Sequence, residues 1–245
     1  MWAWFHRMAS PPHFYRTATR WIPRLLWPSL ILLSIGLVWG LAVAPADYQQ
    51  GDSFRIIYIH VPAAMLSMSI YVSIAISAAV SMIWKIKMAD VVAKVSAPIG
   101  AWFTFLALFT GAIWGKPMWG AYWVWDARLT SELILLFLYF GLIAIHAAIE
   151  DRILAAKAAG VLGLVGVVNI PIIHYSVVWW NTLHQGSTIA KFGKPSMDIE
   201  MAIPLFILIL AFNLLAAAMV LMRTRNEIID RESDRQWVAE LEDLK

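Results

Sequence analysis

The sequence contains no cysteine, and only 14% of its 245 residues are charged. Without cysteine the chain has no disulfide, no thiolate metal site and no C-x-x-C-H motif for covalent haem attachment. Any prosthetic group would be held non-covalently or through histidine. A soluble protein usually has about 25% charged and about 45–50% apolar residues, whereas this chain is 61% hydrophobic with a mean hydropathy of +0.69. The composition therefore predicts a membrane protein with no room for a soluble catalytic domain.

Six apolar segments are each long enough to cross the hydrocarbon core, which takes about 20 helical residues. They run approximately over residues 25–44, 61–84, 97–114, 129–149, 158–178 and 200–222. We therefore predict an all-α polytopic membrane protein, a single domain over residues 1–245 with six transmembrane helices and a tail at 223–245. The first segment is interpreted as an uncleaved span, because its apolar run is too long for a signal peptide, a region of 24 residues precedes it and Pro45 follows its Ala-Val-Ala directly.

The basic residues are divided unevenly between the two sides of the predicted bundle. Of the 19 Lys and Arg residues, 14 lie in the N-terminal segment, the second and fourth connections and the tail. By the positive-inside rule, both termini are then cytoplasmic. Three outer loops follow, at about residues 45–60, 115–128 and 179–199. The net charge of +3 reflects this topology and is not interpreted as affinity for nucleic acid.

The second outer loop concentrates four tryptophans in the segment WGKPMWGAYWVWDARL, residues 114–129. If residues 119–126 are helical, Trp119 and Trp123 are i,i+4 neighbours, and their indoles form a flat shelf suited to a planar macrocycle. The alternative is an aromatic belt at the membrane interface. We favour the shelf, because a belt spreads tryptophans among helix ends. The four are Trp114, Trp119, Trp123 and Trp125.

Two of the six histidines lie at the level of this loop. His60 precedes the second span and His184 lies in the third outer loop, so both could approach one iron from opposite faces. Neutral imidazole is a standard haem ligand. The alternative is that both are ordinary interfacial polar residues. His174, inside the fifth span, is interpreted as structural and is the first substitute if either ligand fails.

Cations on the outer side are candidate partners for the two propionates of a haem. They are Arg55, Lys116 and Arg128, with Arg preferred for its bidentate geometry. The alternative is that they reflect topology or pair with outer carboxylates. Those carboxylates are Asp47, Asp52 and Asp126.

Two further carboxyl groups have open or structural interpretations. Asp126 could be a helix cap, a salt-bridge partner or a contact to another protein. Glu132 is expected in the first turn of the fourth span, where a carboxylate favours the positive end of the helix. We interpret Glu132 as structural.

Three segments together resemble the cytochrome c maturation protein C (CcmC) family of haem-handling membrane proteins. WGKPMWGAYWVWD resembles the family's tryptophan-rich WWD signature. APADYQQGDSFRIIYIHVPAA and NIPIIHYSVVWWNTLHQGST resemble two other family segments. The resemblance covers essentially the whole chain and is weakest in the N-terminal segment and the tail.

The resemblance implies a bacterial inner-membrane protein that binds haem b non-covalently at its periplasmic face. It implies that His60 and His184 are the axial ligands of the haem iron. The matching positions of the haem platform and its edge are Trp114, Trp119, Trp123, Trp125, Asp126, Arg128 and Arg55.

The resemblance also implies haem delivery, rather than an enzymatic reaction, for the biogenesis of c-type cytochromes. The receiver would be a periplasmic haem chaperone, CcmE. Further partners would be the ATP-binding cassette subunits CcmA and CcmB, the single-span protein CcmD and membrane lipid. The chain itself has no G-x-x-x-x-G-K-[ST] nucleotide-binding loop.

Two other functions compete with this interpretation. An electron-transfer subunit of the cytochrome b type would need ligand histidines in pairs on facing helices, whereas His146 and His174 lie near opposite ends of their spans. The third possibility is a small-solute transporter or a pure assembly scaffold. A transporter would need charged or broken-helix sites near the midplane, and the sequence contains no convincing one.

Overall fold

The structure is a computed structural model that describes residues 9–180, 182–184 and 197–242. Within these ranges the chain is almost entirely helical and forms no β-strand, only an isolated bridge between Asp47 and Gly51. Six helices are long and apolar enough to cross a membrane. The predicted all-α, six-span fold is confirmed, and the chain is a multi-pass membrane protein.

The helical elements follow the chain in a simple up-and-down order. They are α2 (Pro11–Val38), the π-helical turn η1 (Trp39–Val43), the 3-10 turn η2 (Asp52–Ile56), α3 (Ile57–Trp84), α4 (Lys87–Trp119), α5 (Ala127–Ala148), α6 (Arg152–Gly166), α7 (Asn169–Trp179), α8 (Ile199–Arg231) and α9 (Gln236–Glu242). Several helices are longer than the apolar segments of the sequence. The 33 residues of α8, for example, extend over about 50 Å, against about 30 Å of hydrocarbon.

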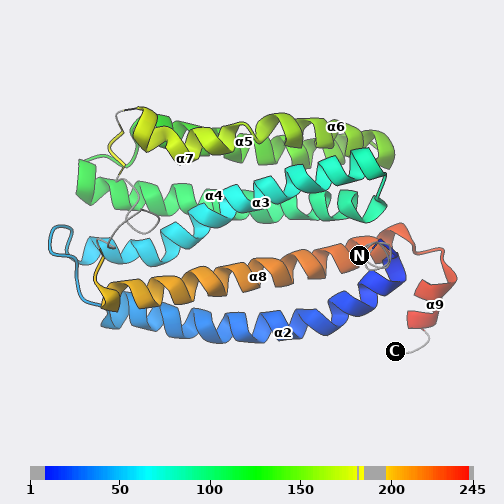
Figure 1. The fold of residues 1–245 in the computed structure, drawn as a ribbon, viewed down its shortest axis with the longest axis horizontal. Coiled ribbons are helices and arrows are strands. Elements are labelled where there is room, and N and C mark those ends of the chain that lie inside the picture. Colours follow the sequence, from blue (N-terminus) through cyan, green and yellow to red (C-terminus); the bar gives the residue numbers. More distant parts are fainter. Residues whose placement is uncertain (1–8, 181, 185–196, 243–245) are drawn as a thin grey trace.

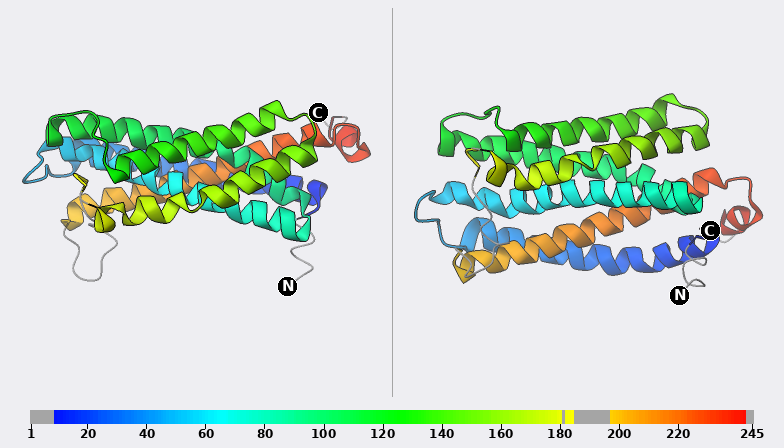
Figure 2. Two further views of the ribbon diagram at one scale, coloured as in Figure 1. Left: turned by 90° about the horizontal axis from the view of Figure 1, so that it is seen from above. Right: turned by 45° about the horizontal axis from the view of Figure 1, so that its top comes forward.

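The spans form a bundle along one common axis, with α3 and α4 in the middle (Figures 1 and 2). The pair α2 and α8 packs on one flank, and α5 with α6 and α7 packs on the other. The start of α2 and the short helix α9 lie at the same end of the bundle, which we call the terminal end. The opposite end, which holds the connections before α3 and α5 and residues 182–184, is called the loop end.

The fifth span is broken into α6 and α7 near its middle. Residues 167 and 168 form a turn, and Ile170 N–H bonds to the carbonyl of Val167. Pro171, in the first turn of α7, has no N–H to donate to that carbonyl and its ring disfavours a continuous α-helix. The break lets α7 take its own direction toward the loop end, where it packs on α5.

Two fully buried tyrosines fill the middle of the bundle. The rings of Tyr71 and Tyr139 meet edge to face at a centroid distance of 5.2 Å. The Tyr139 hydroxyl donates to the carbonyl of Ser67, at 2.7 Å. The ring of Tyr139 packs directly on Gly100 of α4, where a side chain would collide with it. This contact sets the approach of α5 to α3 and α4 near the middle of the bundle.

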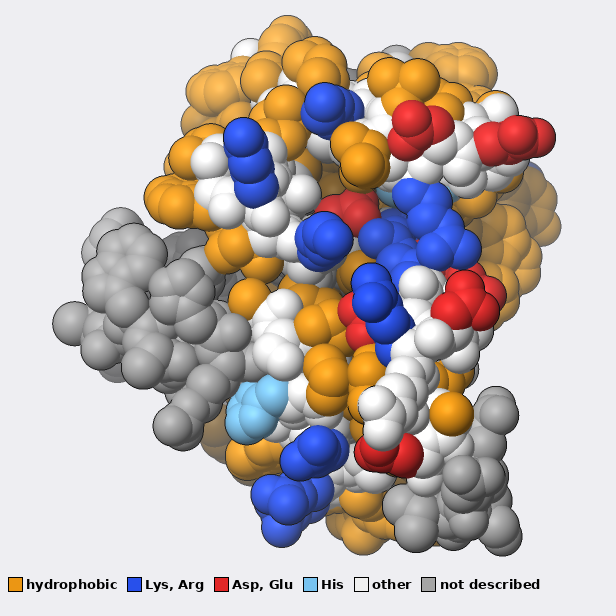
Figure 3. Space-filling view, turned by 90° about the vertical axis from the view of Figure 1, so that its right-hand side faces the viewer, with side chains coloured by type: hydrophobic (Ala, Val, Ile, Leu, Met, Phe, Trp, Pro, Cys, Tyr) orange, Lys and Arg blue, Asp and Glu red, His pale blue; other side chains and the backbone are white. Residues whose placement is uncertain are grey.

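The terminal end carries a network of ion pairs between α4 and α8. Arg231 bonds to Asp90 at 2.6 Å and to Glu227 at 2.7 Å, and Lys94 also bonds to Glu227 at 2.7 Å. Figure 3 looks onto this end and shows Lys and Arg side chains spread widely over it. The basic face is the surface expected for the cytoplasmic side of a membrane protein.

Candidate functional site

A pocket opens at the loop end between α3, α4 and α5. It encloses about 780 Å³ of empty space, including the part open to solvent. Its walls are mostly apolar and aromatic. The described residues that line it are Gln50, His60, Ala64, Ala107, Leu108, Gly111, Trp114, Met118, Trp119, Trp123, Arg128, Leu129, Glu132 and His184.

The end of α4 places the first two tryptophans on the pocket wall. The helix ends at Trp119, followed by Gly120 at φ 77°, a left-handed conformation typical of a helix C-terminus. The indole of Trp119 folds back over Gly115, where a Cβ atom would lie 2.9 Å from the ring. A side chain at position 115 would therefore push this indole away.

The predicted helix over residues 119–126 is wrong. The chain leaves the helical conformation at Gly120 and is extended or bent up to Asp126, the N-cap of α5. The reason is local, because glycine at this position favours the left-handed turn that ends α4. Trp119 and Trp123 both line the pocket, but from different elements rather than from one helical face.

His60 is held in one orientation by α4. Its Nδ1 lies 3.0 Å from the carbonyl oxygen of Ala107 and 3.1 Å from Oγ1 of Thr110. Since a carbonyl oxygen can only accept, the proton belongs on Nδ1 and the lone pair on Nε2. Gly111 permits the approach, as its Cβ would lie 3.0 Å from Cε1 of the imidazole. A metal-binding histidine commonly donates its second nitrogen to a carbonyl in this way.

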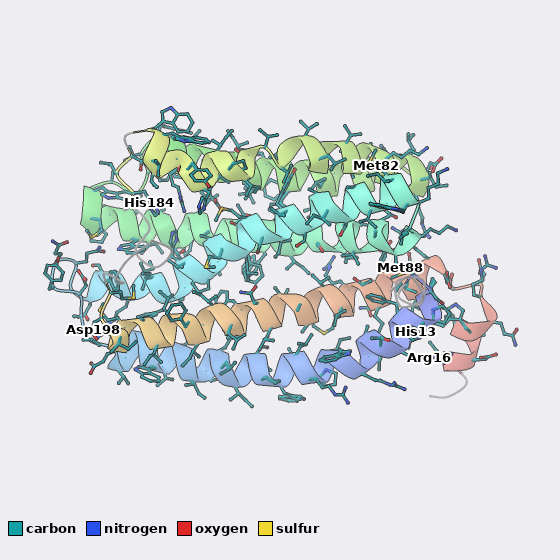
Figure 4. The ribbon with its side chains drawn as sticks, viewed as in Figure 1. His13, Arg16, Met82, Met88, His184 and Asp198 are labelled. Carbon is teal, nitrogen blue, oxygen red and sulfur yellow. The ribbon has the colours of Figure 1, made fainter. Side chains whose placement is uncertain are left out.

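His184 lies at the loop end (Figure 4), far from Met82, Met88 and His13 at the terminal end. The ring centroids of His184 and His60 are 6.2 Å apart, with their planes inclined at 33°. A metal–imidazole bond is about 2 Å long and the ring centre lies about 1 Å beyond the nitrogen, so two imidazoles on one metal have centroids about 6 Å apart. The observed separation is compatible with axial ligation of a single metal.

The tryptophans surround this histidine pair. Trp114 meets His60 edge to face at 5.6 Å, and Trp119 lies 6.4 Å from His184 between ring centroids. Trp114 Nε1 donates to Gln50 Oε1 at 2.8 Å. Trp123 also lines the pocket, and its buried Nε1 has no hydrogen-bond partner among the described residues. That N–H is a donor left for an acceptor supplied by a ligand or by water.

Trp125 does not belong to the pocket wall as the structure describes it. Its side chain is 75% exposed and meets the ring of Trp123 edge to face at 5.4 Å. It therefore packs against Trp123 from outside the described wall and presents an exposed apolar surface.

Of the predicted propionate partners, Arg128 alone is among the described residues that line the pocket. It also donates from NH1 to the carbonyl of Ile173 on α7, at 3.1 Å.

Arg55 instead pairs with Asp52 at 2.8 Å and donates to the carbonyl of Gly40. Lys116 is exposed and donates to the carbonyl of Gly120 at 3.0 Å. The alternative interpretation, pairing with an outer carboxylate, therefore describes Arg55, whereas the hydrogen bond of Lys116 goes to a backbone carbonyl.

Asp126 is a helix cap. Its Oδ1 accepts a hydrogen bond from the backbone N–H of Leu129 at 2.8 Å, which satisfies a donor at the start of α5. Its buried Oδ2 has no hydrogen-bond partner among the described residues. Asp126 does not line the pocket as described, but its capping bond positions the start of α5, from which Arg128 reaches the wall.

The sequence interpretation missed three polar or polarisable residues of the pocket: Gln50, Met118 and Glu132. Glu132 is not in the first turn of its helix but further along it, facing inward, with a hydrogen bond to Ser67 of α3. An ionisable residue inside an apolar span is a signal for function, and that signal could have found it. Nothing in sequence spacing marks Met118 as a wall residue.

The other two histidines of the spans lie away from the pair. His174 is exposed on α7, against the ring of Tyr175, and His146 lines a smaller pocket near the terminal end, together with Asp90. No cluster of three or more His, Cys, Asp or Glu that could hold a bare metal ion occurs among the described residues. The paired imidazoles and flat aromatic walls instead suit a metal that brings its own planar ligand.

Comparison with known proteins gives a consistent result over the whole length. The family model described as "Heme exporter protein C" (CcmC) matches residues 4–239. The chain is 56% identical over 241 residues to Heme exporter protein C of Escherichia coli (strain K12), covering 98% of this chain and 97% of that protein. The protein of the same name from Haemophilus influenzae is 54% identical over 241 residues, with 98% of each chain covered. That from Bradyrhizobium diazoefficiens is 50% identical over 224 residues, 91% of this chain and 85% of the relative.

Proposed function

The chain belongs to the haem exporter protein C family, and from this premise we propose that it binds haem b non-covalently at its loop end and delivers it for c-type cytochrome biogenesis. In this proposal the pocket carries haem and catalyses no reaction, so the protein is a carrier and not an enzyme. Haem supplies the metal and the planar ring. The chain supplies the ligands of the iron and the walls of the pocket, and leaves one edge of the porphyrin accessible.

One observation carries the proposal: two imidazoles whose ring centroids are 6.2 Å apart. His60 and His184 are the proposed axial ligands. The bond from His60 Nδ1 to the Ala107 carbonyl leaves Nε2 as the metal-binding nitrogen and fixes the plane of the ring. His184 lies in the connection between α7 and α8 rather than in a helix, so its displacement from the iron would not require a span to move.

The remaining walls of the pocket fit the other parts of the macrocycle. The indoles of Trp114, Trp119 and Trp123 offer apolar surface for the ring. The Arg128 guanidinium and the orphaned N–H of Trp123 are donors for propionate oxygens. We retain Trp125, Asp126 and Arg55 as part of the wider site, with Trp125 as a surface for the receiving protein and the other two as supports of the backbone.

Delivery requires that haem leave as well as bind. His60 and His184 would hold the iron, and release would start at His184, which lies outside the helices, rather than at His60 on α3. A receiving histidine on a periplasmic chaperone of the CcmE type could then replace it, while His60 stays anchored on α3 and α4. The ATP-binding cassette subunits CcmA and CcmB and the single-span CcmD are the proposed further partners.

The proposed orientation in the bacterial inner membrane follows from charge. The terminal end carries the broad basic surface of Figure 3 and is placed in the cytoplasm by the positive-inside rule. The loop end, with the haem pocket, is then periplasmic.

The test is an absorption spectrum of the full chain in lipid nanodiscs, with added haem, before and after reduction. We expect the wild type to give the low-spin spectrum of bis-histidine haem. His60→Ala and His184→Ala should each lose that spectrum, and added imidazole should restore part of it. His146→Ala is the matched control, since this histidine lies near the terminal end, and it should bind haem normally.

Two results would contradict the proposal. Absence of haem binding by the wild type would reject the function itself. Wild-type spectra from both His60→Ala and His184→Ala would reject the ligand pair, and loss of the spectrum in His146→Ala would instead favour an electron-transfer cytochrome with its haem near the terminal end.

A further inference from the structure

Glu132 is a carboxyl group inside a membrane-spanning helix to which the proposed function gives no role. It is only 8% exposed, and it lines the same pocket as His60 and His184. Burying a carboxyl group in an apolar span is costly, so such a group is retained where it does something.

The hydrogen bonds of Glu132 suit both of its protonation states. Its Oε1 lies 2.7 Å from Ser67 Oγ, and the same Oγ lies 2.8 Å from the carbonyl oxygen of Ala64. A hydroxyl has one proton to donate and lone pairs to accept with. Ser67 donates to Glu132 when the carboxyl is ionised. When it is protonated, Glu132 donates to Oγ and Ser67 donates to Ala64.

The backbone at Ser67 is itself held in place by the Tyr139 hydroxyl, which donates to its carbonyl at 2.7 Å. The Glu132 carboxyl can therefore donate or accept a proton at the inner end of the pocket. A proton can be taken up or released there without leaving a buried group unsatisfied.

We propose that Glu132 is the proton-linked counter-charge of the bound haem, ionised when the iron is ferric and protonated when it is ferrous. The inference rests on the proposed function. A ferric porphyrin core has one net positive charge and a ferrous core has none. When an external reductant supplies one electron to the iron, the carboxylate takes up one proton from solvent, and the net charge inside the pocket does not change.

The other titratable groups around Glu132 are few. Arg128 lies one turn earlier on the same helix, and Tyr139 lies further along it. From α3 the pocket is lined by His60, and from residues 182–184 by His184, both of which are bound to the iron in the loaded protein. The described residues of α4 that line the pocket carry no charge. Glu132 is thus the acidic member of the described pocket wall.

The expected effect of the Glu132 charge on the redox potential of the iron follows from the distance between the two. Ser67 follows His60 by seven residues, about 10 Å along a helix. A unit charge about 10 Å away at an effective dielectric constant of about 20 changes an equilibrium about tenfold. For a one-electron couple a tenfold change is about 59 mV, which a redox titration resolves easily.

The experiment is a spectroscopic redox titration of the haem-loaded full chain in nanodiscs between pH 5 and pH 9. We expect the wild-type midpoint potential to fall as the pH rises. Glu132→Gln keeps the shape and a bond to Ser67 but cannot ionise. It should lose most of that slope, and at high pH its ratio of ferrous to ferric haem at a given potential should be about tenfold above wild type.

Two further variants separate the charge from the fold. Glu132→Asp retains a carboxyl group and should retain a pH slope. Glu200→Gln removes an exposed carboxylate at the start of α8 and should behave as the wild type. A pH-independent potential in the wild type would overturn the inference whatever the variants do. Normal haem binding by Glu132→Gln with unchanged slope and potential would overturn it too, and would leave the haem-carrier function intact.

Discussion

The contact between Gly100 and Tyr139 predicts that the substitution Gly100→Ala destabilises the bundle strongly. A methyl group on Gly100 would overlap the Tyr139 ring, and that ring is fully buried and has no room to retreat. Overpacking of a tight core costs about 1–3 kcal/mol. If the ring moves, its hydroxyl loses the bond to Ser67, which leaves buried polar groups unpaired at about 1–3 kcal/mol.

A gain in helix propensity partly offsets these costs. Alanine is favoured over glycine by about 0.8–1.0 kcal/mol inside a helix. The net destabilisation expected for Gly100→Ala is therefore about 1–5 kcal/mol. For a chain of this size about 1 kcal/mol corresponds to a change of about 2–4 °C in the melting temperature, so we expect the melting temperature to fall by roughly 2–20 °C.

Gly163 in α6 provides the matched control. A Cβ atom there would lie 3.5 Å from Cγ2 of Ile74, an ordinary van der Waals contact. Gly163→Ala should therefore benefit from the higher helix propensity of alanine without a steric clash. It should melt at the same temperature as the wild type or slightly above it. Intrinsic tryptophan fluorescence during a thermal ramp in nanodiscs measures both variants side by side.

The double variant Gly100→Ala/Tyr139→Leu tests the mechanism, because the smaller side chain removes the overlap. Adding Gly100→Ala to a Tyr139→Leu background should cost much less than adding it to the wild type. The reasoning is refuted if Gly100→Ala melts within about 2 °C of Gly163→Ala, since both glycines would then tolerate a methyl group equally.

Two further predictions concern the ends of the bundle. Asp126→Ala removes the N-cap of α5 and should cost about 1 kcal/mol, while Asp126→Asn should cost less; equal melting temperatures for both variants would argue against the cap. Arg231→Met leaves Asp90 and Glu227, at 12% and 13% side-chain exposure, without their shared partner and should cost about 3 kcal/mol. Arg152→Met, which breaks a pair at 56% and 69% exposure, should cost less than about 1 kcal/mol, and similar thermal shifts for these two arginine variants would contradict the distinction.

The tryptophan loop shows what a residue pattern predicts about structure and what it does not. The concentration of indoles in one loop predicts a shared surface, and Trp114, Trp119 and Trp123 line one pocket. The proposed helical face for Trp119 and Trp123 is wrong, because Gly120 ends α4 between them. A periodic pattern cannot distinguish a helix from a turn that happens to place both rings on the same side.

For the charged residues, position in the sequence groups side chains that the structure separates. Sequence position grouped Arg55 with Arg128, since both are expected at the outer side. The structure separates them, because Arg55 is held by Asp52 and the Gly40 carbonyl, whereas Arg128 lines the pocket. Glu132 was assigned to the helix dipole, and its inward direction became visible only once α5 was packed against α3.

The sequence by itself determined the class of the protein and the number of its spans. Apolar segment length decides whether a helix can cross a membrane, and that property is local to each segment. The absence of cysteine and the position of His60, His184 and the four tryptophans in the predicted outer part of the chain were likewise visible in the sequence.

Only the tertiary structure decided which side chains meet. The orientation of His60 depends on a carbonyl and a hydroxyl of α4, 47 and 50 residues away in sequence. The partner of Glu132 lies on α3, and its separation in sequence is 65 residues. Such contacts depend on the rotation and approach of whole helices, which are set by distant glycines and buried rings rather than by the residues that form the site.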